Sequence, residues 1–134
     1  MMRFLWLLIL LAACTPATTP SPSPSGNLIR GTFDLVGGAN FDKSSDGSCV
    51  GNGGYSDIAA GLGVTATNQA GTIIGTSNLQ PGQSQGTKCV FAFTIRQLPD
   101  ADFYSFEVGS RGELTYSRAE MESFDWQLAF SIGS

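Results

Sequence analysis

KCVFAFTIR, residues 88–96, is the stretch of the chain that decides its fold. Every second position lies on one face of this stretch, and that face carries Cys89, Phe91, Phe93 and Ile95. A period of two, with β-branched and aromatic residues, is typical of a β-strand that turns one face to the core. Residues 88–96 are therefore predicted to form such a strand.

The same alternation recurs in other parts of the chain. It is found in the runs Thr32–Leu35, Tyr104–Val108 and Trp126–Ile132. Residues 63–67 and 72–75 form two further runs, and the four residues Asn68–Gly71 between them are typical of a hairpin connection. The pattern predicts an all-β domain of about seven strands, either an antiparallel β-sandwich or a Greek-key barrel.

One short helix is predicted near Arg118–Ser123. Ser117 stands directly before it, and Glu120 follows three residues later. This is the S-x-x-E pattern of a capping box, in which the serine hydroxyl and the glutamate carboxylate each accept a hydrogen bond from the other residue's backbone N–H. The helix is therefore expected to begin at Arg118.

The first fourteen residues read MMRFLWLLILLAAC, with Arg3 as their only charge. A positive start, an apolar run and small residues before a cut are typical of a secretory signal peptide. Leu11-Ala12-Ala13-Cys14 resembles the lipobox of bacterial lipoproteins. That resemblance implies a signal peptide at 1–13, cleavage before Cys14 and a diacylglyceryl group on its thiol, which anchors the chain stably because two acyl chains enter the membrane. An ordinary cleaved signal with a chance cysteine is the alternative.

A linker follows the cysteine. Thr15–Gly26 reads TPATTPSPSPSG and holds no charge and no large apolar residue. Such a segment cannot form a core and favours extended polyproline II. Residues 14–26 are therefore predicted to be the lipidated cysteine and its tether. The 108 residues at 27–134 are predicted to form one β domain.

Charge and the absence of histidine limit the functions that are open to the chain. Without Arg3, six basic residues face eleven acidic ones, a net charge of −5. This argues against nucleic acid as a partner, because phosphates attract a basic surface. The chain has no histidine, the usual general base and the commonest metal ligand. It therefore lacks every Ser-His or Cys-His nucleophile pair.

Two cysteines remain besides Cys14. Cys49 and Cys89 are an even pair, and an exported chain meets an oxidising compartment, where cysteines pair. A disulfide between them would fasten the glycine-rich segment 37–54 to the core side of residues 88–96. Two free thiols are the alternative.

Six short motifs together resemble a small uncharacterised domain of secreted and membrane-tethered bacterial envelope proteins, notably actinobacterial ones. They are GTFDL (31–35), DGSC (46–49), GGYSDI (53–58), CVFAF (89–93), DFY (102–104) and RGELTYS (111–117). The resemblance implies a β domain with its two cysteines paired. It implies no activity and no catalytic residues.

One motif suggests a metal. Asp42, Ser44 and Asp46 place side-chain oxygens at positions 1, 3 and 5, and Gly47 stands at position 6, as in the first half of a calcium loop. The glutamate expected at position 12 is replaced by Gly53. The alternative is that these residues make a turn. Calcium is the only cofactor that the sequence suggests.

Several side chains near predicted turns are candidates for a binding surface. Phe41, Tyr55 and Tyr116 offer aromatic rings that stack on sugars or anchor protein contacts, and Arg111 offers a charge. The acidic residues are spread along the chain, and no pair is marked by position for the two-carboxylate chemistry of a glycosidase. They are therefore interpreted as a solvated surface.

The sequence thus predicts a lipid-anchored protein of the cell membrane or outer membrane, facing outside the cytoplasm. Its β domain is expected to bind an envelope protein or a cell-wall glycan without catalysis. A carboxylate-dependent wall hydrolase and a structural or inhibitory lipoprotein are the alternatives.

Replacing the lipobox cysteine tests the anchor. In Cys14→Ala the thiol that accepts the lipid is absent, so metabolic labelling with a radioactive fatty acid is expected to disappear, and the chain to remain an uncleaved precursor or to be released. Membrane flotation and gel mobility measure both results. A Cys14→Ala chain that still carries label and floats with membranes would contradict the anchor.

Overall fold

The computed structural model describes residues 14–17 and 26–134, so the predicted signal peptide at 1–13 and tether residues 18–25 lie outside the described residues. Within the described residues the strands are β1 (Asn27–Val36), β2 (Phe41–Lys43), β3 (Ser48–Gly51), β4 (Gly63–Asn68), β5 (Ile73–Asn78), β6 (Gly82–Gln85), β7 (Lys88–Leu98), β8 (Phe103–Val108), β9 (Glu113–Ser117) and β10 (Gln127–Gly133). A 3-10 turn, η1 (Gly53–Tyr55), and one helix, α1 (Arg118–Ser123), complete these elements.

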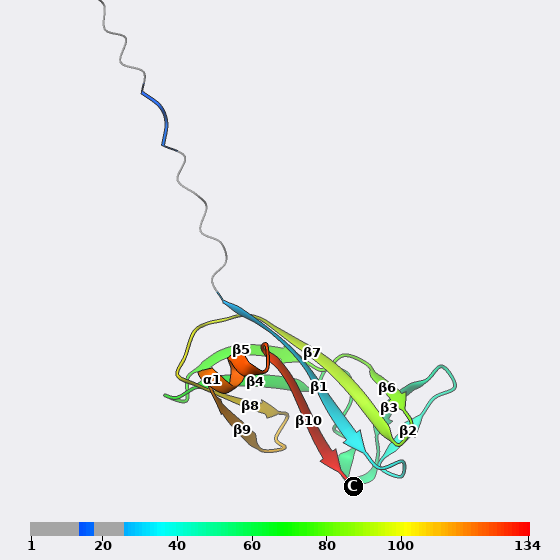
Figure 1. Ribbon diagram of the computed structural model, residues 1–134. Coiled ribbons are helices and arrows are strands. Elements are labelled where there is room, and N and C mark those ends of the chain that lie inside the picture. Colours follow the sequence, from blue (N-terminus) through cyan, green and yellow to red (C-terminus); the bar gives the residue numbers. More distant parts are fainter. Residues whose placement is uncertain (1–13, 18–25) are drawn as a thin grey trace, which may run out of the picture.

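The strands form two sheets that pack face to face (Figure 1). One sheet has six strands in the order β10-β1-β7-β6-β3-β2, and the other has four in the order β5-β4-β8-β9. The predicted all-β sandwich is confirmed. The described residues hold ten strands rather than about seven, because short strands such as β2 and β6 have too few residues to show alternation.

The predicted core strand is β7, which pairs with β1 on one side and β6 on the other. Its alternation is confirmed, since Cys89, Phe91, Phe93 and Ile95 are all buried. Phe93 lies opposite Gly31 of β1, where a β-carbon would overlap the phenyl ring. Glycine at position 31 therefore leaves room for the Phe93 ring to lie over β1.

The helix carries the chain from one sheet to the other. The predicted capping box is present: Glu120 N–H donates to Ser117 Oγ at 3.2 Å, and Ser117 N–H donates to Glu120 Oε2 at 2.7 Å. After α1, Asp125 and Trp126 adopt positive φ angles of 53° and 58°, which turn the chain into β10. The chain therefore leaves β9, at the edge of the four-stranded sheet, and enters β10, at the edge of the six-stranded sheet.

Strand β10 runs parallel to β1, with Arg30 opposite Gln127 and Val36 opposite Gly133. The other strand pairs are antiparallel as predicted, and the parallel pair is the exception. Because β10 is reached through α1 rather than through a hairpin, it can start at the same end as β1 (Figure 1).

The two long sides of the sandwich differ. On one side β5 lies against β7, where a β-carbon on Gly75 would be 2.8 Å from the Ile95 side chain. On the other side β9 and β10 are each the last strand of their sheet and belong to different sheets. The sandwich is therefore closed along β5 and β7 and open between β9 and β10.

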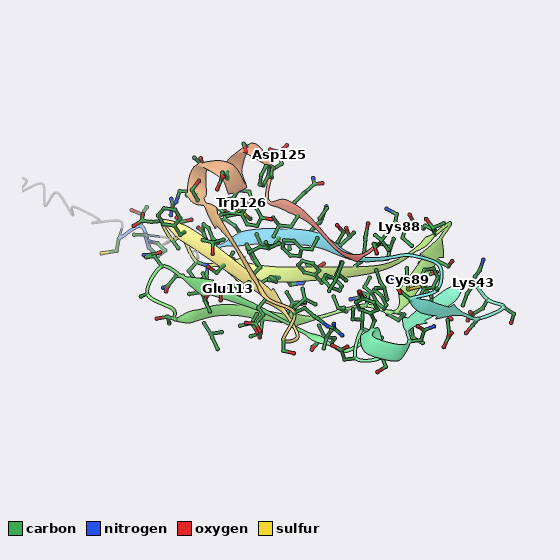
Figure 2. The ribbon with its side chains drawn as sticks, turned by 90° about the horizontal axis from the view of Figure 1, so that it is seen from below. Lys43, Lys88, Cys89, Glu113, Asp125 and Trp126 are labelled. Carbon is green, nitrogen blue, oxygen red and sulfur yellow. A yellow bond between two sulfur atoms is a disulfide. The ribbon has the colours of Figure 1, made fainter. Side chains whose placement is uncertain are left out.

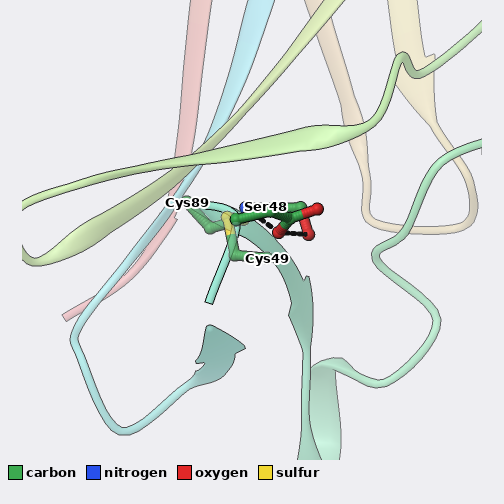
Figure 3. The surroundings of a disulfide bond; sticks show 4 residues. Ser48, Cys49 and Cys89 are labelled. Atoms are coloured by element: carbon green, nitrogen blue, oxygen red, sulfur yellow. Dashed lines mark hydrogen bonds between the residues drawn. A yellow bond between two sulfur atoms is a disulfide. The ribbon is translucent and has the colours of Figure 1, made fainter. Parts of the chain in front are cut away.

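The disulfide predicted between Cys49 and Cys89 is confirmed, with Cα atoms 6.0 Å apart (Figure 3). Cys49 lies on β3 and Cys89 on β7, and β6 runs between these two strands. A β-carbon on Gly82 of β6 would be 2.7 Å from the Cys89 sulfur. The bridge therefore crosses over β6 at a glycine and holds three strands together from inside the core.

Removing this bridge tests its structural role. It closes a loop with a sequence separation of 40, which in the chain-entropy model corresponds to about 4 kcal/mol of stability. The double variant Cys49→Ser, Cys89→Ser is expected to have a melting temperature about 15 °C or more below that of the parent. This is the shift that such a loss of stability causes in a domain of this size. Cys14→Ser is the matched control and leaves the melting temperature unchanged. Equal melting of the double variant and the parent would contradict a structural role.

Candidate functional site

Two hollows lie in the opening between β9 and β10, and together they are named the β9–β10 groove. The first has a volume of about 240 Å³, and both sheets line it: Phe33, Phe130, Ser131 and Ile132 from one, and Phe106, Val108, Arg111, Gly112, Glu113 and Leu114 from the other and the turn before β9. The second has a volume of about 390 Å³ and is lined by Tyr116, Phe124, Gln127, Leu128 and Ala129.

Aromatic rings form the floor of the groove. The ring of Tyr116, on β9, stacks on that of Phe130, on β10, with centroids 6.4 Å apart. The ring of Phe106 is tilted against that of Phe130, with centroids 6.2 Å apart, and Phe124 meets Tyr116 edge-on at 5.7 Å. Tyr116 lines the second hollow and Phe130 the first, so their contact separates the two.

The phenol of Tyr116 stays protonated at neutral pH. Burial raises the pKa of Tyr116 above its ordinary value of 10.0, and the negative charge of Glu120 raises it further. The side chain therefore keeps a neutral hydroxyl, which can donate or accept a hydrogen bond.

An arginine is fixed at the other end of the groove. Arg111 Nε donates to Asp57 Oδ2 at 3.1 Å, and Nη2 donates to the other carboxylate oxygen of Asp57 and, at 2.8 Å, to the carbonyl of Gly54. Its guanidinium carbon lies 5.2 Å from the centre of the Tyr55 ring. These contacts hold the turn before β9 against the segment that follows β3.

The hydrogen bond between the two side chains shifts both pKa values. The Arg111 guanidinium lowers the pKa of the Asp57 carboxyl below its ordinary value of 3.8, and the Asp57 carboxylate raises the pKa of Arg111. Both groups are therefore charged at neutral pH, and each balances the other's charge.

The structure brings together some of the residues that the sequence singled out. Tyr55 and Arg111 contact each other, and Arg111 and Tyr116 line the two hollows of the groove. Phe41 does not belong to this surface: its side chain is 6% exposed and packs in the core. Sequence reasoning missed Leu114, whose only signal was a large apolar residue between charged and polar neighbours.

The residues of the suggested calcium loop have other roles. Asp42 lies in β2 and accepts a hydrogen bond from Asn52 Nδ2 at 3.0 Å. Asp46 accepts bonds from the Ser48 hydroxyl at 2.6 Å and the Ser48 N–H at 2.9 Å, which lower the pKa of Asp46. The described residues contain no group of three or more acidic or cysteine side chains placed to hold a metal ion. Asp42 lies in β2, and Ser44 and Asp46 lie in the turn between β2 and β3; calcium binding at this turn stays a prediction.

Comparison with known proteins gives no relative: no protein-family model, characterised protein or solved structure matches the chain. The resemblances inferred from the lipobox and from the six motifs therefore stay predictions. Among the described residues, no helix is long and apolar enough to span a membrane.

The contact between Arg111 and Asp57 has a measurable signature. In Arg111→Ala the pKa of Asp57 is expected to rise to its ordinary value near 3.8, because the hydrogen-bonded cation is absent. Since the folded-state pKa of Asp57 is lowered, the contact stabilises the parent above about pH 4, and this contribution is lost as the pH falls through the lowered pKa.

Carboxyl ¹³C NMR titration measures the pKa. Arg118→Ala is the matched control, because Arg118 is also a surface arginine near an aspartate but does not contact Asp57. The same Asp57 pKa in the parent and in Arg111→Ala would show that this contact does not form in solution.

Proposed function

We propose that this chain is a lipid-anchored protein of the bacterial cell envelope, and that its β domain binds a protein or a glycan in the β9–β10 groove without catalysis. The anchor rests on the lipobox around Cys14, which the structure places as an exposed free thiol among the described residues. The observation that carries the binding role is the opening between two sheet edges, lined by aromatic rings from both sheets.

The rim of the groove offers apolar surface to a ligand. Leu114, in the first hollow, is 49% exposed, and Phe124, in the second, is 44% exposed. Large apolar side chains that meet water beside a concave surface are typical of ligand-binding sites. Removing them from water contributes roughly 25 cal/mol for each Å² that a ligand covers.

The walls of the groove are already held in place. Arg111 fixes the turn at one end through Asp57 and Gly54, and the capped helix α1 closes the other end. In Figure 2 this helix, with Asp125 and Trp126 beside it, lies at one end of the strands. A preformed site loses little conformational entropy on binding, which favours affinity.

The groove is poorly suited to a wall hydrolase. Glycoside hydrolysis uses two carboxylates on either side of the scissile bond. Of the described residues that line the two hollows, Glu113 is the only acid. A binding role is therefore the better match, and a purely structural or inhibitory role has no observation of its own in its favour.

Photo-crosslinking in live cells tests the proposed site. A benzophenone amino acid at position 114 or 124 of the full-length chain is expected to crosslink to a protein or to wall material, because both side chains face the groove. Ile73, which is 63% exposed on β5, is the matched control and is expected to give no such product. Equal crosslinking from positions 73, 114 and 124 would contradict the groove as the binding site.

Incubation with purified peptidoglycan tests the absence of catalysis. The chain is expected to bind it or to ignore it, and to leave the polymer uncut. Release of soluble fragments that stops in Glu113→Gln would show that the chain is an enzyme.

A further inference from the structure

Strand β10 presents an unpaired backbone edge to the groove. Among the described strands it pairs with β1 alone, and Arg30 N–H donates to the carbonyl of Trp126 at 3.2 Å. Backbone groups alternate in direction along a strand, so the even-numbered residues of β10 face β1 and the odd-numbered ones face away. Among the residues that the structure describes, the N–H and C=O groups of Ala129 and Ser131 have no hydrogen-bonding partner.

This edge lacks the features by which other edges resist pairing. Proteins protect edge strands with charge, proline, short length or a covering element. Strand β2 is three residues long and carries Asp42 and Lys43, β9 carries Glu113, and β5 lies against β7. Strand β10 reads QLAFSIG, with neither charge nor proline over seven residues.

The groove has the form that an added strand requires. A strand beside β10 turns every second side chain to the same face as Leu128 and Phe130, and that face borders the groove. The two hollows lie along β10, one beside residues 127–129 and the other beside residues 130–132. At about 240 and 390 Å³, the two hollows lie below and near the lower end of the roughly 300–1,000 Å³ of small-molecule sites. Two separate hollows along a strand suit alternate side chains of one extended chain.

The charges around the groove indicate the chemistry of the added strand. Arg111 is bound to Asp57, and Arg118 lies 3.6 Å from Asp100 and donates to the Ala101 carbonyl. Within the described residues Glu113, which lines the first hollow, forms no salt bridge, and neither do Glu122 and Asp125, in and directly after α1. Arg30, which lies on β1 opposite Gln127, is a cation that also forms none. Three acids against one cation favour a positively charged ligand.

We infer that the ligand is an extended polypeptide segment, with apolar residues at alternate positions and lysine or arginine at its ends, which adds to the edge of β10 as a further strand. The backbone of Ala129 and Ser131 pairs with the backbone of the segment, and the two hollows take its apolar side chains. This inference rests on the proposed function and names the ligand of the same site.

Selection from a library tests it. The full-length chain, purified in mild detergent, is used to select from a phage-displayed library of random twelve-residue peptides. Selected peptides are expected to alternate apolar residues between basic ends. Methylating the backbone nitrogens of the peptide that face β10 removes hydrogen-bond donors without altering the protein, and is expected to weaken binding by about tenfold or more. Methylating the backbone nitrogens that face away from β10 is expected to have a smaller effect.

A pair of protein variants tests the same contact from the other side. Ser131→Pro removes an unpaired N–H that the fold does not use, and is expected to weaken peptide binding by about tenfold or more. Ser131→Ala keeps the N–H and removes only the hydroxyl, so its loss of binding is expected to be much smaller than that of Ser131→Pro. Circular dichroism checks that both variants fold. If Ser131→Pro does not fold, the binding of the methylated peptides tests whether the backbone of β10 pairs with the peptide.

The outcomes separate this inference from the proposed function. Failure to select any peptide, or selected peptides that bind equally well after methylation on either side, would overturn strand addition. If the chain instead binds purified wall glycan and Leu114→Glu abolishes this binding, the groove still binds a ligand and only the inferred class of ligand is wrong. If neither peptide nor glycan binds and position 114 gives no crosslink in cells, both proposals fall.

Discussion

The buried face of β7 is the constraint on which the rest of the structure depends. Its phenyl rings need partners on both sheets, and Phe93 finds one in Phe130 of β10, whose ring is stacked at 6.0 Å. The ring fits because Gly31 leaves room on the strand between β7 and β10. The contact of Phe93 with Phe130 in the core therefore determines where β10 lies. Because β10 forms one wall of the groove, the same contact determines the position of that wall.

A short helix rather than a turn joins β9 to β10, and this explains why the sandwich stays open on that side. A tight hairpin would have made the two strands neighbours in one sheet. Instead α1 and the positive φ angles of Asp125 and Trp126 place β10 beside β1 and parallel to it. Two sheet edges then face each other across a floor of aromatic rings, so the candidate site is a consequence of topology.

Much of the fold could be predicted from the sequence, because the signals are local. The alternation in β7, the hairpin of β4 and β5 and the capping box of α1 each depend on a few neighbouring residues. The disulfide joins distant residues, and it was predictable because Cys49 and Cys89 are the two cysteines that remain besides Cys14. Other contacts between distant residues left no such signal. The parallel pair of β1 and β10, the burial of Phe41 and the contact of Arg111 with Asp57, 54 residues away, depend on how the sheets pack. The sequence therefore named Arg111 and Tyr116 but could not join them in one groove.

An unprotected edge strand can pair with the same strand of a second copy, so some feature of the groove must disfavour this pairing. A second copy would bring its own β10, which has no lysine or arginine to meet the acids around the groove. It would also bring its own Glu113, Glu122 and Asp125, in a chain whose net charge without Arg3 is −5. Like charges at close range cost several kcal/mol. The same acids that favour a basic ligand therefore disfavour edge-to-edge pairing of two copies, and β10 can remain open for a different chain.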